Sequence, residues 1–316
     1  MTPPIHFRIG TRSSQLALWQ AEHIADLLQS QGCTTSLVTY ETKGDKQLET
    51  TIAKIGSKGV FTEELEQDLL ADKIDLAIHS AKDLQSTMPA GLELIAFTER
   101  ELAFDVVLSL DKHLDLNAPG LIVGSSSTRR RALLAKYYPN ITPVEARGNL
   151  QTRLQKLKDG HFQAMLLAYA GVHRMGFDDY VVHQFPLDQF VPPTGQGSIA
   201  VQCAASLSPA HKQLVRATCN HANTELCLLT ERAYLARLDG GCSIPVFAHA
   251  TLQGDALRFH AGIISLDGQD YLDQVYQHSG PTTDLAREIG THVAETVLSL
   301  GGGGILQTIR QTLART

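Results

Sequence analysis

The stretch Leu121–Arg153, LIVGSSSTRRRALLAKYYPNITPVEARGNLQTR, decides the fold. An apolar strand-like segment, Leu121–Val123, leads through a Gly-Ser-Ser-Ser turn into the helical segment Arg129–Tyr137. The same order repeats at once, with strand character at Pro143–Ala146 and a helix at Leu150–Leu157. Strand and helix alternating at this spacing predict an α/β fold with mainly parallel sheets.

The turns of this stretch have the composition of an anion site. Residues 124–131 read GSSSTRRR, so free N–H groups at a helix start, serine hydroxyls and guanidinium groups follow a strand directly. A solvated helix start with chance arginines is the alternative interpretation. Arginines also follow other strands. Arg147 and Arg153 follow the next strand, Arg12 follows the first strand of the chain, and Arg174 follows the strand at 164–168. Because parallel strand ends meet in one crevice, this pattern predicts a ligand with several carboxylates or phosphates.

The same alternation extends on both sides, and the last third of the chain differs. Further strands are expected at 7–11, 36–41, 76–79, 92–97, 106–109 and 164–168, and helices at 14–29, 61–71 and 209–238. Three strand-like segments then follow closely, at 245–252, 256–264 and 271–278. Short turns at Gly254-Asp255 and Asp267-Gly268 make them an antiparallel meander. A helix at 283–300, ended by the glycine run 301–304, and a final helix complete a predicted α+β unit.

Composition limits the class of ligand. The 316 residues suffice for two or three domains, and 43% hydrophobic residues supply their cores. The net charge of −6 disfavours non-specific nucleic-acid binding. Residues 121–175 nevertheless hold nine Lys and Arg against two acids. A local basic site in an acidic chain predicts one anionic ligand of small or medium size.

We expect a cytoplasmic protein with no membrane contact. The N-terminus, MTPPIHFRIG, lacks the apolar run of a signal peptide, and the longest apolar run, 164–172, is too short to span a bilayer. The five cysteines form no CxxC pair and no zinc spacing, so we expect reduced, mostly buried thiols and no metal: Cys33, Cys203, Cys219, Cys227 and Cys242.

Three further segments contain residues that could take part in catalysis or ligand binding. In 79–83, HSAKD, Asp83 beside Lys82 is a candidate charge stabiliser or acid/base, and a helix cap beside a solvated lysine is the alternative; His79 is expected to be a packing residue. In 238–245, LDGGCSIP, Cys242 lies in a turn suited to a covalently used thiol, and an ordinary loop cysteine is the alternative. Residues 42–58 are either a loop over a site or an ordinary surface loop.

Taken together, these motifs resemble those of porphobilinogen deaminases (hydroxymethylbilane synthases) over essentially the whole chain. Each motif alone is weak, but their order and spacing match as well. The matching segments are Arg8–Ser13, Leu16–Gln20, Thr42–Asp45, Gly56–Gly59, His79–Asp83, Gly124–Arg130, Arg147–Arg153, Gly195–Gly197 and Leu238–Pro245.

The resemblance implies a transferase of haem and other tetrapyrrole biosynthesis. Family members join four porphobilinogen molecules head to tail, release ammonia at each step, and free the linear tetrapyrrole hydroxymethylbilane. They use a dipyrromethane cofactor attached to a cysteine by a thioether, and Cys242 falls on that cysteine. Asp83 falls on the catalytic aspartate, which stabilises positive charge on the pyrrole as ammonia leaves.

The resemblance also implies the binding residues. The cofactor is expected to contact Ser80, Lys82, Asp83, Ser127, Arg129, Arg130, Arg147 and Arg153. The substrate is expected to contact Arg12, Gln20, Arg147, Arg153 and Arg174, and Lys58 lies in the lid loop. A growing chain of up to six pyrroles has two carboxylates on each, which a crevice lined by arginines suits.

The implied fold has two α/β domains like those of periplasmic binding proteins, joined by a double crossover, and a smaller α+β domain with a three-stranded antiparallel sheet. We expect domain 1 at 1–98 plus 198–217, domain 2 at 99–197 and domain 3, with the cofactor cysteine, at 218–316. The family is generally monomeric, so we expect a monomer.

Some positions depart from the family pattern. Ala81 replaces a larger apolar residue, Glu63 replaces a common lysine, Gln202 replaces a common glutamate, and Leu102–Val106 lacks an arginine near the hinge. A diverged paralogue of low activity is therefore one alternative. A non-enzymatic two-lobed anion-binding protein is another, but it leaves the third domain and Cys242 without a role.

Overall fold

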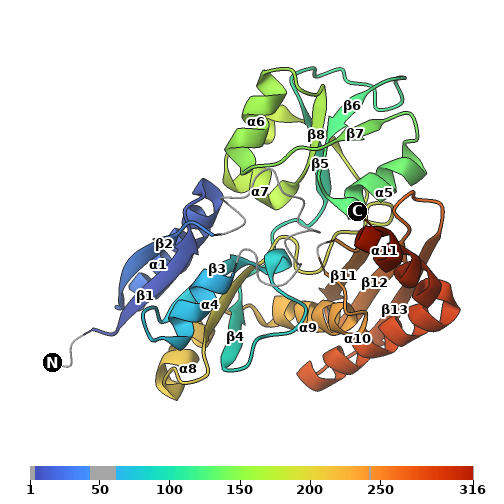
Figure 1. Ribbon diagram of the computed structural model, residues 1–316. Helices are drawn as coiled ribbons and strands as arrows, with labels where there is room; N and C mark the ends of the chain where they lie inside the picture. Colours follow the sequence, from blue (N-terminus) through green and yellow to red (C-terminus); the bar gives the residue numbers. More distant parts are fainter. Residues whose placement is uncertain (1–3, 43–61, 242, 316) are drawn as a thin grey trace.

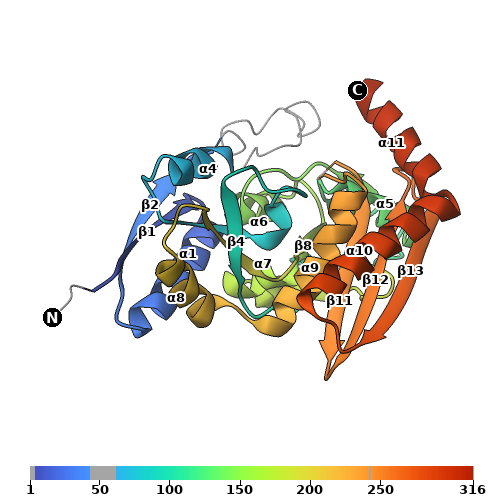
Figure 2. The same cartoon turned by 90° about the horizontal axis from the view of Figure 1, so that it is seen from below.

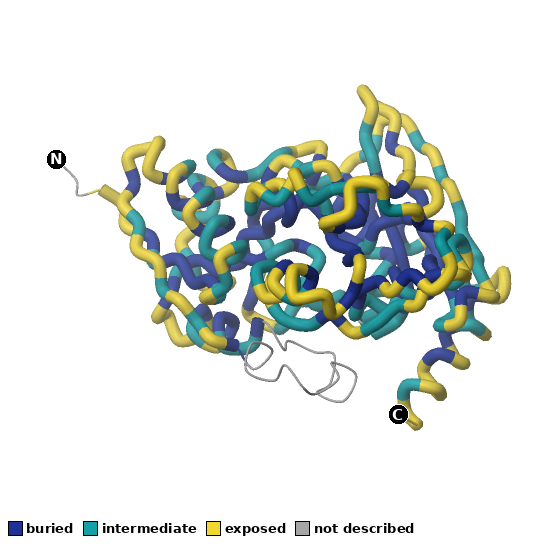
Figure 3. The backbone as a smooth tube through the Cα atoms, turned by 90° about the horizontal axis from the view of Figure 1, so that it is seen from above, coloured by how far each residue is buried: buried dark blue, intermediate teal, exposed yellow. Residues whose placement is uncertain are grey.

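Three β-sheets, each covered by helices, make up the computed structural model, which describes residues 4–42, 62–241 and 243–315 (Figure 1). Two sheets have five strands and the third has three. Buried segments run through the inside of the molecule, while the exposed ones lie on its outside (Figure 3). The expected class, two α/β units with a smaller α+β unit, is confirmed.

The first sheet has the strand order β2-β1-β3-β10-β4. Its strands are β1 (His6–Arg12), β2 (Thr34–Tyr40), β3 (Leu76–Ser80), β4 (Leu92–Phe97) and β10 (Ile199–Ala204). Strand β1 pairs in parallel with β2 and β3, whereas β10 is antiparallel to both of its neighbours. The chain therefore leaves this sheet after β4 and returns about a hundred residues later to fill the place between β3 and β4.

Helices cover both faces of the first sheet. Helices α1 (Gln15–Ser30) and α8 (Pro209–Cys219) form one hydrophobic core with the strands. Helix α4 (Glu63–Leu70) forms a second, separate core with the strands. Helix α1 starts where the Ser14 side chain accepts a hydrogen bond from the Ala17 N–H. Its buried residues recur at helical spacing, which fixes the face that meets the sheet.

The second sheet has the order β7-β6-β8-β5-β9. Its strands are β5 (Asp105–Ser109), β6 (Ile122–Gly124), β7 (Thr142–Val144), β8 (Ala164–Ala168) and β9 (Val181–Gln184). Strand β6 is parallel to β7 and β8, and β5 is antiparallel to β8 and β9. Both sheets are thus half parallel, so the expectation of mainly parallel sheets is only partly right.

Helix α5 (Thr128–Tyr137) covers one face of this sheet, and α6 (Leu150–Lys158) and α7 (Tyr169–Arg174) cover the other. The core between α5 and the second sheet also contains Phe247 and Ile264 of the third sheet. A side chain at Gly268 would clash with the backbone of α5, because its Cβ would lie 2.5 Å from the Ala132 oxygen. The third sheet is therefore packed directly against α5.

The third sheet is the predicted meander of β11 (Val246–Gln253), β12 (Ala256–Ile264) and β13 (Tyr271–Ser279). Helices α9 (Ala222–Arg237) and α10 (Thr283–Val297) share its main core. Helix α11 (Gly303–Arg315), the last element of the chain (Figure 2), adds Leu306 and Ile309 to the same core.

Two helical predictions need correction. Residues 209–238 form two helices, because Asn220 has an extended backbone and its side chain accepts a hydrogen bond from the Phe97 N–H. The glycine run does not end helical structure either: a π-helical turn, Leu298–Gly302, connects α10 to α11 (Gly303–Arg315), and only Gly301 (φ 117°) is non-helical. Elements β9, β10, α7 and the short helix Asp178–Tyr180 were not expected.

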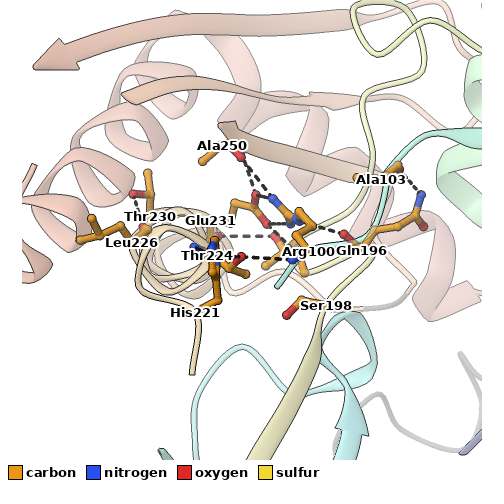
Figure 4. A network of polar contacts seen from close by, with 12 residues as sticks. Arg100, Ala103, Gln196, Ser198, His221, Thr224, Leu226, Thr230, Glu231 and Ala250 are labelled. Carbon is orange, nitrogen blue, oxygen red and sulfur yellow. Dashed lines mark hydrogen bonds and ion pairs between the residues drawn. The ribbon is translucent and has the colours of Figure 1, made fainter. Parts of the chain in front are cut away.

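A buried ion pair joins both crossings to the third sheet (Figure 4). Arg100, on the way out of the first sheet, donates to both carboxylate oxygens of Glu231 on α9, at 2.7 and 2.8 Å. The same carboxylate accepts from the backbone N–H of Gly195, on the way back, and of Ala250 on β11, each at 2.8 Å. The Arg100 Nε also donates to the Gln196 oxygen. Glu231 is fully buried, so these four donors satisfy it without water.

Removing this carboxylate is expected to destabilise the fold strongly. Glu231→Ala leaves the Arg100 guanidinium buried without an anion, which lowers the free energy of unfolding by about 3–5 kcal/mol. Urea denaturation measures the difference. Glu295→Ala is the control, because its pair with Arg237 is exposed and is worth less than about 1 kcal/mol. Equal losses in the two variants would contradict this account.

Candidate functional site

A pocket lies between the first two sheets, where the crossings meet them. Its wall includes Leu16 on α1, Leu167 at the end of β8, and Gly195 and Gly197 on the returning crossing. Six predicted site residues line it: Gln20, Ser80, Lys82, Arg130, Arg153 and Arg174. Of the arginines that follow strands, Arg130, Arg153 and Arg174 are brought into this one pocket, whereas Arg12 and Arg147 are not in its wall.

The first sheet supplies its residues through one short turn. Strand β3 ends at Ser80, and a 3-10 turn, Ala81–Asp83, follows. The Gln20 amide donates to the Ser80 hydroxyl at 2.9 Å. Gly195 (φ +77°) passes so close that a Cβ there would lie 2.7 Å from the Ala81 carbonyl carbon. A glycine is therefore required where the returning crossing presses on this turn.

The second sheet supplies its cations from helix starts. The Ser127 side chain caps α5 by accepting from the Arg130 N–H at 3.4 Å, and Asn149 caps α6 by accepting from the Thr152 N–H at 2.9 Å. Arg130 and Arg153 lie in the first turns of these helices, and the Arg153 Nε donates to the Gly148 oxygen at 2.7 Å. The helix starts also present a positive dipole end to an anion.

Asp105 holds two of the three arginines of α5, a role that the sequence did not indicate. Its carboxylate accepts from Arg129 at 2.6 Å and from Arg130 at 2.7 Å, and the Gln196 amide adds a third donor at 3.0 Å. Although burial raises the pKa of Asp105, the two guanidinium groups hold it well below its usual range. Arg129 also donates to the Val191 oxygen, is 4% exposed and is not in the pocket wall.

The pocket holds cations in excess of anions. The pKa of Lys82 is lowered to about 8 and that of Arg153 to about 10. Burial is the largest cause and neighbouring arginines add to it, whereas Asp83 acts in the opposite direction on both. Burial also lowers the pKa of Arg174. The Nε of Arg130 is buried without a hydrogen-bond partner in the described part of the chain. Such a site is stabilised by a ligand that brings several negative charges.

Asp83 is the carboxylate next to these cations. It ends the Ala81–Asp83 turn, is partly buried, and raises the pKa of His79 as well as those of Lys82 and Arg153. An ionised carboxylate held in this place can stabilise positive charge that develops on a ligand.

The remaining predicted residues are not in the pocket wall or lie outside the described residues. Those that are described but not in the wall are Arg12, Asp83, Ser127, Arg129 and Arg147. Arg12 ends β1. The pKa of the buried His79 is lowered to about 4, mainly by burial and further by the charge of Arg12. The Arg147 Nε donates to Glu145 at 3.0 Å. Cys242 and Lys58 belong to the residues that the structure does not describe, as does the predicted loop from residue 43 onwards.

His79 and the described cysteines have structural surroundings. His79 shares a hydrogen bond of 3.0 Å with Gln202, whose amide donates to the buried Glu66 at 3.3 Å. Cys33, Cys203, Cys219 and Cys227 are free and buried. Over residues 4–42, 62–241 and 243–315, no group of three or more acidic, His or Cys side chains is placed to hold a metal. No helix in these ranges has the length and apolar character needed to cross a membrane.

Two family models match the chain. The model described as "Porphobilinogen deaminase, dipyromethane cofactor binding domain" matches residues 7–212, and "Porphobilinogen deaminase, C-terminal domain" matches 225–299. A porphobilinogen deaminase of Desulfosudis oleivorans is 49% identical over 97% of this chain and 99% of its own. That of Cytophaga hutchinsonii is 47% identical over 98% of both chains.

Solved structures show a more distant likeness. The VFT2 domain of Bordetella pertussis BvgS is 14% identical, with a TM-score of 0.41 over 68% of this chain and 86% of its own. A periplasmic binding protein of Salmonella typhimurium with high arginine specificity is 14% identical, with a TM-score of 0.39 over 68% of this chain and 91% of its own. Both likenesses are partial.

Binding of a carboxylate ligand is expected to weaken at alkaline pH. Lys82 binds an anion in its protonated form, which is lost as pH rises through its pKa of about 8. The dissociation constant of such a ligand is therefore expected to rise up to about tenfold between about pH 7 and pH 9. Lys82→Gln is the control: its dissociation constant is high at neutral pH and does not rise further. A flat profile for the unchanged protein would contradict the role of Lys82.

Proposed function

The chain belongs to the porphobilinogen deaminase family, and on that premise we propose which of its residues perform the reaction. It is an enzyme of the transferase class in tetrapyrrole biosynthesis, and its family uses a dipyrromethane cofactor. The observation that supports our assignment is the pocket itself, where Lys82, Arg130, Arg153 and Arg174 converge. Each pyrrole of substrate and product has two carboxylates, and these cations match them in charge.

The residues present fit the cofactor. Four cations with few anions, and a buried Nε of Arg130 without a partner, suit a group with several carboxylates. We assign its contacts to Ser80, Lys82, Asp83, Ser127, Arg130, Arg147 and Arg153, and its attachment to Cys242. Arg129 instead supports Arg130 by sharing the Asp105 carboxylate. When bound, the cofactor supplies the free pyrrole position at which chain growth begins.

Substrate binding is assigned to a set of residues that overlaps with the cofactor contacts at Arg147 and Arg153. Arg174, Arg12, Arg147 and Arg153 bind the carboxylates of porphobilinogen, and Gln20, fixed by Ser80, orients the pyrrole. The bond that breaks joins the aminomethyl carbon to nitrogen, and ammonia leaves with the electron pair. The positive charge left on the pyrrole is stabilised by Asp83, the carboxylate beside the pocket cations.

We further propose the domain boundaries 98/99, 197/198 and 217/218. The first and second sheets exchange the chain between β4 and β5 and again between β9 and β10, which supports the first two boundaries. We propose a cytoplasmic monomer that does not bind nucleic acid. The free, buried thiols support the cytoplasmic location. The burial of Arg129 and Arg130 inside the protein supports the absence of nucleic-acid binding.

The attachment at Cys242 is tested by the intact mass of the purified protein and a peptide map around this residue. We expect an adduct of two pyrrole units on Cys242, present after purification or formed on incubation with porphobilinogen. Cys33→Ser is expected to keep the adduct and Cys242→Ser to lack it under both conditions. An unmodified Cys242 after incubation would contradict the assignment and favour a non-enzymatic anion-binding protein.

The role of Asp83 is tested by Asp83→Asn, which keeps the shape of the side chain and removes its charge. Losing electrostatic stabilisation of the cation is expected to lower kcat by about 100-fold to 1,000-fold. The matched control, Asp284→Asn, changes an exposed carboxylate on α10 and leaves kcat unchanged. The measurement is the initial rate of hydroxymethylbilane formation. If Asp83→Asn and Asp284→Asn turn over at similar rates, Asp83 is not catalytic.

A further inference from the structure

Trp19, the only tryptophan of the chain, lies against a pocket arginine. Its ring on α1 faces the guanidinium of Arg174 on α7, whose central carbon is 5.3 Å from the ring centroid. The indole stacks on His23 at 5.4 Å with an angle of 3° between the rings, and its inner side packs against the core of the first sheet. The contact therefore connects a helix of the first sheet to a helix of the second.

Arg174 depends on this contact for its place. In the described part of the chain its guanidinium makes one hydrogen bond, from Nη2 to the Gly197 oxygen at 2.7 Å, and has no ion pair. The ring face and the Gly197 oxygen together leave the other N–H groups available to a ligand in the pocket, which Arg174 and Gly197 both line. An aromatic face attracts a guanidinium most strongly where water is excluded, as at this partly buried position.

We propose that Trp19 is a positioning residue that holds the Arg174 guanidinium for a carboxylate of the incoming porphobilinogen, with His23 holding the indole. The inference rests on the assignment of Arg174 to substrate binding made above. Trp19 acts on the substrate only through Arg174. Its effect is therefore on substrate affinity, and it disappears when Arg174 is removed.

A double-mutant cycle tests the proposal. Trp19→Leu keeps apolar packing on the core but removes the ring face, and it is expected to raise KM about fivefold with little change in kcat. Trp19→Phe keeps a ring face and is expected to restore most of the affinity. In the Arg174→Ala background, Trp19→Leu is expected to change KM by less than about twofold, because the two residues act as one unit.

The outcomes separate the two claims. If Arg174→Ala leaves KM unchanged, Arg174 does not bind substrate and the assignment above fails. If Arg174→Ala raises KM but Trp19→Leu raises it equally in both backgrounds, Trp19 does not act through Arg174 and the present inference alone is overturned.

Tryptophan fluorescence gives a readout that needs no turnover and no change at Trp19. All indole emission comes from Trp19, so Arg174→Ala is expected to change the emission intensity. Porphobilinogen is expected to change the emission of the unchanged protein, and to change that of Arg174→Ala much less. Arg287→Ala, an exposed arginine on α10, is the matched control and leaves the emission unchanged. Identical emission in Arg174→Ala and the unchanged protein would overturn the contact.

Discussion

The carboxylate of Glu231 is the constraint on which the arrangement of the three sheets depends. It accepts two hydrogen bonds from Arg100 and one each from the N–H groups of Gly195 and Ala250, so one buried group fixes both crossings and an edge strand of the third sheet. The returning crossing then presses Gly195 against Ala81, at the turn that presents Lys82 and Asp83. The position of the Ala81–Asp83 turn is therefore linked, through backbone contacts, to an ion pair outside the pocket.

A second buried carboxylate organises the other wall. Asp105, at the start of β5, pairs with both Arg129 and Arg130, and Gln196 of the returning crossing donates to the same carboxylate. Helix α5, which contains these arginines, also packs against Phe247 and Ile264 of the third sheet. The third unit thus contacts the two crossings through its helix α9. It also contacts the second sheet, through α5.

Local sequence predicted much of the fold and the site because both depend on strand-turn-helix units. The bounds of Leu92–Phe97 and Ala164–Ala168 agree with the structure, and Lys82, Arg130 and Arg153 meet as their places after strands indicate. Gln20 followed from the family resemblance alone. What local sequence missed depends on distant partners. Asp105 and Arg129 are 24 positions apart, and Arg100 and Glu231 are 131 apart. Likewise, Asn220 interrupts a continuous helical pattern because it binds Phe97 on another strand.

Hydrogen exchange at two backbone amides tests most directly whether one carboxylate couples these parts. Gly195 and Ala250 are far apart in sequence, and their N–H groups both donate to Glu231. In Glu231→Met, which removes the acceptor and keeps most of the volume, both amides are predicted to exchange about 10-fold to 100-fold faster, because each loses a hydrogen bond to a charged group. The amide of Thr312, in the last turn of α11, exchanges by local fraying rather than by global unfolding, and it is predicted to keep its rate. Acceleration at only one of the two amides, or at neither, would contradict the account.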